Sequence, residues 1–131
     1  MFTMKRFTLL TILMSLFVAA SVFADDKIKH VDAAGAAKLI AEGKVTVVDV
    51  RTSDEYSEGH LKDAKNIDIM SKDFAAKLGE LDKSKPVLVH CQAGGRSTRA
   101  LPTLEKLGFT DITHLDGGMN DWVKAGQPVV K

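Results

Sequence analysis

Residues 86–97 read PVLVHCQAGGRS, and this stretch decides the fold class. The run Pro86–His90 is almost continuously apolar, which is typical of a strand covered on both faces in a parallel sheet. Cys91 follows this strand directly, and the loop after it leads into a helix predicted over Ser97–Leu107. Open parallel sheets bind their ligands at the carboxyl ends of strands. The pattern therefore places Cys91 where such a fold holds its ligand.

Short β-branched runs alternate with helical patterns along the rest of the chain. Asp32 and Ser71 are predicted to cap helices, and Gly43 and Gly108 follow predicted helix ends. The expected strands are 27–31, 45–50, 66–69, 86–90 and 111–115, and the expected helices are 33–42, 72–78, 97–107 and 119–125. Since strands that alternate with helices are joined by crossovers, we expect one α/β domain with about five mostly parallel strands and helices on both faces.

Composition excludes several classes of protein. The chain has 131 residues, room for one domain, and its 45% hydrophobic and 27% charged residues are ordinary for a folded protein. Lys and Arg number 18 against 17 Asp and Glu, and no basic run marks a nucleic-acid surface. Cys91 is the single cysteine, so it forms no intramolecular disulfide and no paired-cysteine redox or zinc motif.

Residues 1–24 have the pattern of a secretory signal peptide. The first six residues carry two positive charges, Phe7–Ala20 is apolar apart from hydroxyl residues, and Val22-Phe23-Ala24 puts small residues at the recognition positions before Asp25. The alternative is an uncleaved membrane anchor, which the short apolar stretch and the cleavage site disfavour. We expect an exported mature domain, residues 25–131, without a membrane segment after cleavage.

The loop after Cys91 is suited to an anion. A chain that leaves a strand and enters a helix can turn its backbone N–H groups toward one centre, and Gly94 and Gly95 permit the close approach that this needs. The charge of Arg96 and the start of the helix add positive potential. The sequence thus predicts a nucleophilic thiolate with a low pKa. The alternative is an inert buried strand residue, because free cysteine is often buried.

The loop CQAGGRS, residues 91–97, resembles the active-site loop of single-domain rhodaneses, the thiosulfate sulfurtransferase family. The resemblance covers about residues 28–128. Together with the export signal, it makes the chain similar to the small periplasmic rhodaneses. Further segments agree with the family's pattern in order: Val48-Asp49-Val50-Arg51, Glu55-Tyr56, Gly59-His60-Leu61, Ala64, Asn66-Ile67, Leu107-Gly108-Phe109, Leu115-Asp116-Gly117-Gly118 and Trp122.

The resemblance implies a rhodanese-like domain that moves sulfur. In that reading Cys91 takes sulfane sulfur from a donor such as thiosulfate, holds it as a persulfide and passes it to a thiophilic acceptor such as cyanide or a thiol. Arg96 holds anions and fixes the loop, and no cofactor is required. The substrate-binding cradle comprises Gln92, Ala93, Gly94, Gly95, Arg96 and Ser97. The expected location of the mature protein is the periplasm.

Two other functions remain open at this point. One is a cysteine phosphatase or arsenate reductase on the same scaffold, but those enzymes use HCxxGxxR, and residues 90–96 read HCxxGxR, one residue shorter. The smaller ring suits a sulfur adduct better than a tetrahedral oxyanion. The other is a persulfide relay or binding module whose sulfur acceptor is a partner protein.

Pro102 departs from the expected pattern, because it lies inside the predicted helix and can kink it.

The remaining polar candidates are read as structural. Asp49 and Arg51 are expected to form an ion pair that braces the loop, and His60 is expected in a turn. His30 and His114 have no partners at metal-ligand spacing along the chain, so no metal site is expected.

Alternation along a strand places the side chain before the nucleophile, His90, on the opposite side of the sheet from Cys91. Gly117 and Gly118 are expected to form a turn that can also rim the pocket. Trp122 is expected to anchor the last helix to the core.

Overall fold

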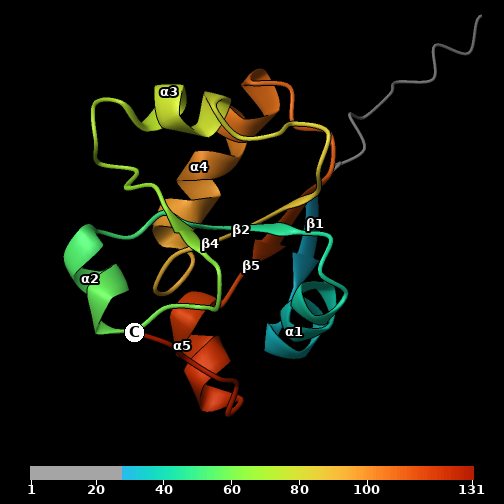
Figure 1. Cartoon of the computed structure of the whole chain (residues 1–131), viewed down its shortest axis with the longest axis vertical. Helices are drawn as coiled ribbons and strands as arrows, with labels where there is room; N and C mark the ends of the chain where they lie inside the picture. The colour runs from blue at the N-terminus through green and yellow to red at the C-terminus, as the bar shows by residue number, and fades with distance from the viewer. Residues whose placement is uncertain (1–27) are drawn as a thin grey trace, which may run out of the picture.

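The computed structural model describes residues 28–131, and the predicted signal peptide lies outside the described residues. Five parallel strands form one sheet in the order β1-β5-β4-β2-β3 (Figure 1). The strands are β1 (Ile28–Val31), β2 (Thr46–Asp49), β3 (Lys65–Asn66), β4 (Val87–His90) and β5 (Ile112–Leu115). The helices are α1 (Ala33–Ala41), α2 (Ser53–Glu58), α3 (Phe74–Gly79), α4 (Gly95–Lys106) and α5 (Gly118–Lys124).

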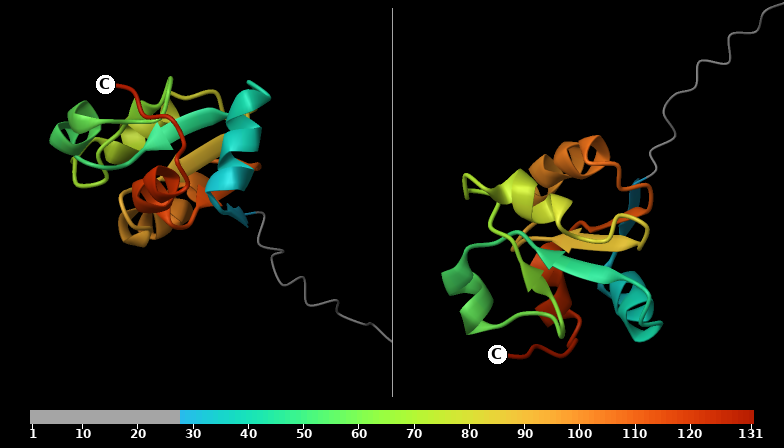
Figure 2. Two further views of the ribbon diagram at one scale, coloured as in Figure 1. Left: turned by 90° about the horizontal axis from the view of Figure 1, so that it is seen from below. Right: turned by 45° about the horizontal axis from the view of Figure 1, so that its top comes forward.

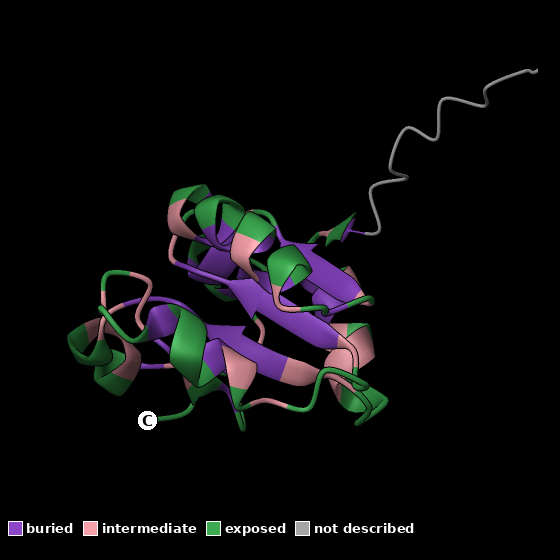
Figure 3. Cartoon of the chain, turned by 90° about the horizontal axis from the view of Figure 1, so that it is seen from above, coloured by how far each residue is buried: buried purple, intermediate pink, exposed green. Residues whose placement is uncertain are grey.

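Helices cover the sheet on both faces, as the sequence predicted. α3 and α4 pack on one face, and α1 and α5 pack on the other, so that the strands lie between two helical layers (Figures 1 and 2). The central strand β4 is buried along its whole length (Figure 3). Val87 and Val89 belong to the core under α3 and α4, and Leu88 belongs to the core under α1 and α5. This two-sided burial explains the continuous apolar run of β4.

Three element ends differ from the predictions by two residues or more. α3 begins at Phe74 after Asp73, and the Ser71 hydroxyl bonds the Asp73 side chain, so the prediction that Ser71 caps a helix starting at residue 72 was wrong. β3 has two residues, shorter than predicted, because it pairs with only the last part of β2. α4 begins at Gly95, two residues earlier than predicted.

α2 is a helix that the hydrophobic pattern did not predict. Its six residues include no buried side chain, so they show no apolar periodicity. The signal present in the sequence is a capping box: the Thr52 hydroxyl accepts the N–H of Glu55, and the Glu55 carboxylate accepts the N–H of Thr52.

Pro102 lies within α4 without ending it, since the helix runs through it to Lys106. The Pro102 side chain is exposed, whereas Leu101 and Leu104 on the same helix are buried in the core.

Among the described residues, the structure shows no helix that is both long and apolar enough to cross a membrane.

Candidate active site

The Cys91 thiol lies at the carboxyl end of β4, in the middle of the sheet, with 1% of the residue exposed. Its Sγ accepts a hydrogen bond from the Gly94 N–H at 3.0 Å and one from the Ser97 hydroxyl at 3.3 Å. The loop therefore curls around the sulfur and presents hydrogen-bond donors to it, as the sequence predicted for an anion site.

Two opposed effects act on the pKa of this thiol. Burial raises it, because a thiolate loses its hydration in the interior. Hydrogen bonds from the Ser97 hydroxyl and from the backbone N–H groups of Ser97, Gly94 and Ala93 lower it. The hydrogen bonds prevail, so the pKa of Cys91 lies below its ordinary value. A sulfur of this kind is an activated nucleophile.

Glycine is required at two positions beside the sulfur. Gly94 has φ +108°, and a Cβ there would lie 2.2 Å from the carbonyl oxygen of Asp116. Gly118 has φ +57°, and a Cβ there would lie 2.4 Å from the carbonyl oxygen of Cys91. The turn at Gly117 and Gly118 thus packs directly against the loop.

The start of α5 fixes the loop backbone. The Met119 N–H donates to the Cys91 carbonyl at 2.9 Å, and the Asn120 N–H donates to the Gln92 carbonyl at 3.0 Å. Trp122 anchors the same helix in the core, and its indole N–H donates to the Pro128 carbonyl at 2.8 Å. This confirms the structural role predicted for Trp122.

A buried ion pair braces the loop from the other side. Arg51 binds the Asp49 carboxylate through Nε and Nη2, at 2.7 to 3.0 Å, and both residues are buried. The same guanidinium donates to the Gly59 carbonyl at 2.7 Å and to the Gln92 side-chain oxygen at 3.1 Å. The Gln92 amide also donates to Asn120 at 2.6 Å. The Gln92 side chain therefore serves to hold the loop in place, and the predicted bracing pair is present.

Arg96 makes a paired contact that sequence reasoning missed. Its Nη1 and Nη2 donate to the two carboxylate oxygens of Glu55 in α2, at 2.6 and 2.9 Å. Hydrogen bonding from Arg96 lowers the pKa of Glu55 to about 2. Because Glu55 lies 41 residues away along the chain, sequence spacing gave no sign of this pair. Arg96 thus ties the loop to α2, and its positive charge is paired with the carboxylate of Glu55.

A cleft of about 210 Å³ opens beside the loop. It is bordered by one arginine, two glutamates and several apolar side chains. The lining residues are Arg51, Glu55, Glu58, Gly59, Gln92, Met119, Val123 and Val129.

Two histidines outside the pocket have structural contacts. His60 lies in an antiparallel bridge with Val130, so the prediction that it lies in a turn was wrong. His90 is fully buried on the face opposite Cys91, and its Nδ1 lies 3.0 Å from the Cys91 carbonyl. Burial lowers the pKa of His90. His60 stacks on Tyr56 with ring centres 3.8 Å apart and exchanges backbone hydrogen bonds with Val130.

A family model described as the rhodanese-like domain matches residues 32–125, which include Cys91, its loop and both arginine–carboxylate pairs. The chain belongs to the rhodanese family. A solved structure of a rhodanese-related protein from Thermoplasma volcanium has a similar fold, with a TM-score of 0.70 and 32% identity over 78% of this chain and 97% of that one.

Curated relatives of this rhodanese domain include sulfurtransferases. The thiosulfate sulfurtransferase GlpE of Shewanella oneidensis is 30% identical over 97 residues, 74% of this chain and 94% of the relative. Thiosulfate sulfurtransferase 16, a chloroplast protein of Arabidopsis thaliana, is 35% identical over 91 residues, 62% of this chain and 76% of the relative. For other curated relatives the match spans 22% to 61% of the relative's own length, less than two thirds.

Proposed function

We propose that this rhodanese is a sulfurtransferase that carries sulfane sulfur as a persulfide on Cys91, with thiosulfate as donor and cyanide or a thiol as acceptor. One observation carries the proposal: a single buried thiol lies inside a ring of hydrogen-bond donors at the end of the central strand. The similarity to GlpE and to the Arabidopsis thiosulfate sulfurtransferase supports the choice of donor.

The first half-reaction is a displacement at sulfur. The Cys91 thiolate attacks the outer sulfur of thiosulfate, an S–S bond forms to Sγ, and the bond between the two sulfur atoms of thiosulfate breaks. The electron pair of that bond leaves with sulfite. The donors that surround the thiolate then stabilise the negative charge of the terminal persulfide sulfur.

In the second half-reaction the acceptor attacks the terminal sulfur of the persulfide. With cyanide, the new carbon–sulfur bond gives thiocyanate, and the electron pair of the breaking S–S bond returns to Cys91. No proton, electron or cofactor is needed from elsewhere, because each step exchanges one anionic nucleophile for another.

Ring size favours sulfur over phosphate as the transferred group. Four residues, Gln92 to Gly95, separate Cys91 from Arg96. A phosphoryl group needs room for several equatorial oxygens and a donor for each, whereas a persulfide adds one atom in line with the thiol. The guanidinium of Arg96, which is bound to both oxygens of Glu55, also points to loop fixation more than to oxyanion binding.

The test is the intact mass of the protein after exposure to thiosulfate. The expected product is heavier by one sulfur atom, returns to the original mass with cyanide and yields thiocyanate, and the Cys91→Ser variant shows no change. An aryl phosphate assayed in parallel is expected to give no product. Faster hydrolysis of the phosphate ester than formation of thiocyanate would overturn the proposal.

We propose further that the protein acts in the periplasm after removal of residues 1–24. The support is the sequence pattern of that segment, with its positive start, short apolar stretch and small residues before Asp25. Protein recovered from the exporting cell is expected to begin at Asp25 by N-terminal sequencing. Membrane-bound protein of full length would contradict the proposal.

A further inference from the structure

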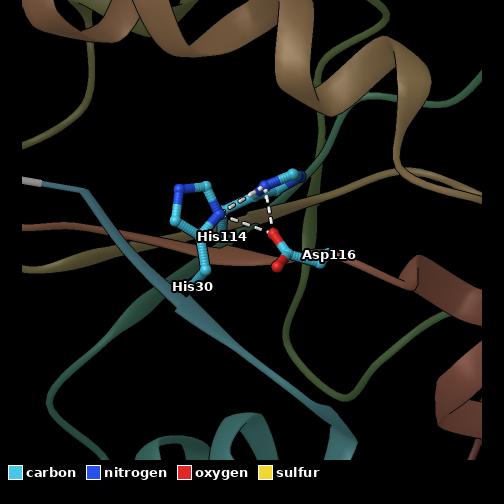
Figure 4. Close-up of side chains that lie close together, drawn as sticks. All are labelled: His30, His114 and Asp116. Carbon is cyan, nitrogen blue, oxygen red and sulfur yellow. Dashed lines mark hydrogen bonds and ion pairs between the residues drawn. The ribbon is translucent and has the colours of Figure 1, made fainter. Parts of the chain in front are cut away.

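The side chain of His30 lies close to those of His114 and Asp116, which are more than 80 residues further along the chain (Figure 4). His30 of β1 and His114 of β5 are direct neighbours across the parallel strand pair, and Asp116 follows His114 by two residues, on the same side of the chain. The Asp116 Oδ1 lies 2.6 Å from Nδ1 of His30 and 2.7 Å from Nδ1 of His114. The two Nδ1 atoms are 3.3 Å apart.

The buried histidine of this cluster is linked to the nucleophile. The other ring nitrogen of His114, Nε2, lies 2.6 Å from the Ser97 hydroxyl, which in turn lies 3.3 Å from Cys91 Sγ. A serine hydroxyl has one hydrogen. For that hydrogen to reach the sulfur, His114 must carry its own hydrogen on Nε2 and donate it to Ser97.

This assignment leaves a conflict at the opposite side of the ring. A neutral His114 with hydrogen on Nε2 has a lone pair on Nδ1, and that lone pair faces a carboxylate oxygen of Asp116 at 2.7 Å. Two acceptors at this distance repel each other unless a cation or a proton lies between them. A hydrogen on Nδ1 would also remove the repulsion, but the Ser97 hydroxyl would then donate its hydrogen to Nε2 and not to the sulfur. A bound cation removes the conflict.

We propose that His30, His114 and Asp116 bind a divalent transition-metal ion, with zinc as the representative ion. Two imidazoles and one carboxylate suit such an ion, and three protein ligands leave a position for water or another ligand. This proposal replaces the expectation of no metal site. The spacing along the chain gave no sign of it, because pairing of β1 with β5 brings His30 to His114 across 84 residues.

The distances are close to those that zinc requires. Tetrahedral coordination with bonds of about 2.0 to 2.1 Å puts ligand atoms roughly 3.3 to 3.4 Å apart. The Nδ1–Nδ1 distance of 3.3 Å already fits. The Asp116 oxygen has to withdraw by several tenths of an ångström, and its side chain is 56% exposed and therefore free to move. The His30 side chain is 46% exposed, so the ion has a path from solvent.

The ion would also have a defined effect on the active site. Coordination at Nδ1 of His114 fixes its hydrogen on Nε2, and the hydrogen bond from Nε2 to Ser97 then orients the serine hydroxyl toward the sulfur. The proposed site thus lies two hydrogen bonds from Cys91 and is separate from the sulfur-transfer step itself.

The test measures zinc binding directly, in tag-free Cys91→Ser protein, so that the thiolate cannot bind the metal. Calorimetry with zinc is expected to give one site per chain, and cobalt is expected to give the visible absorption of a low-coordinate site with nitrogen and oxygen ligands. His30→Ala and Asp116→Ala, both at exposed side chains, are expected to weaken binding at least about a hundredfold. His60→Ala is the matched control and is expected to bind as the parent does.

If the Cys91→Ser protein, in which His30, His114 and Asp116 are all present, did not bind zinc, the proposal would be overturned. Unchanged affinity in both His30→Ala and Asp116→Ala would overturn it too, since the metal would then bind elsewhere. Binding of the metal does not depend on sulfur transfer. The two proposals are therefore tested independently: zinc binding tests the metal site, and the mass of the thiosulfate-treated protein tests sulfur transfer.

Discussion

The Cys91 sulfur is almost fully buried and still has a lowered pKa, a combination that depends on its hydrogen-bond donors. Burial alone protects a thiol and makes it inert. The Ser97 hydroxyl and three backbone N–H groups reverse that effect at this position. Reactivity is therefore a property of the loop conformation, and substitutions in the loop can change it while leaving the sulfur in place.

Ser97→Ala is expected to raise the pKa of Cys91, because the hydroxyl is the strongest of the donors that lower it. A hydrogen bond to a charged group contributes about 1.5 to 3 kcal/mol, so the thiolate fraction at low pH should fall by roughly tenfold or more. The rate of alkylation against pH measures this. Thr98→Val, which removes a hydroxyl bonded to the Gly94 carbonyl, is the control. If the pH at which the alkylation rate of Ser97→Ala inflects were unchanged, the backbone N–H groups alone would account for the lowered pKa of Cys91.

Arg96 and Glu55 act as a pair, so their variants should not be additive. Arg96→Ala removes a positive charge and leaves the Glu55 carboxylate without its arginine partner, and both changes are expected to raise the pKa of the thiol. The double variant Glu55→Gln with Arg96→Ala removes the stranded charge. The pKa of Cys91 should therefore rise less in the double variant than in Arg96→Ala alone, as measured by the rate of alkylation against pH. An equal or larger rise of this pKa in the double variant would show that Glu55 and Arg96 do not act as a pair.

At the scale of elements, the loop is shaped by its contact with the chain after β5. Gly94 lies against the Asp116 carbonyl, and its φ of +108° suits glycine alone. We expect Gly94→Ala to destabilise the protein by at least about 2 kcal/mol, measured by urea denaturation. Gly95→Ala is the matched control, because a Cβ there meets no atom within 4 Å, and it should be tolerated. Equal losses in both variants would show that the close contact is not the cause.

Local signals predicted most elements, and long-range contacts account for what was missed. The β4 strand and the loop after it were predicted because a buried apolar run and two glycines are visible in a short window. α2 was missed because none of its side chains is fully buried and only Tyr56 packs against the core, although its capping box was readable. The pairing of Glu55 with Arg96 and of His30 with His114 joins segments 41 and 84 residues apart, and no spacing rule along one chain reports such contacts.

For the molecule as a whole, buried His90 should make stability depend on pH. An unfolded histidine titrates near about 6.5, whereas burial lowers the pKa of His90 in the folded state, with Asp49 and Arg51 as its charged neighbours. Below about pH 6.5 the unfolded chain therefore binds more protons, so stability is lost as the pH falls and gained as it rises.

His90→Phe should flatten this dependence between about pH 5 and 7, because it removes the titrating group at similar volume. The Cys91 carbonyl keeps its hydrogen bond from the Met119 N–H in the variant. Thermal unfolding across this pH range is the measurement. Val87→Ala, at a buried residue of the same strand, should lower stability equally at every pH. If the stability of His90→Phe changed with pH as steeply as that of the unmodified protein, other titrating groups would be responsible for the pH dependence.

The strand order has a consequence for the way the chain is built. β1 pairs only with β5, and residues that face each other across this pair, such as His30 and His114, are 84 positions apart. During folding the first strand must pair with the last one, so the sheet is complete only when nearly the whole chain takes part. The carbonyl of Asp116 and the start of α5, which hold the Cys91 loop in shape, arrive at that same late stage. We therefore expect the thiol to become reactive only as folding ends.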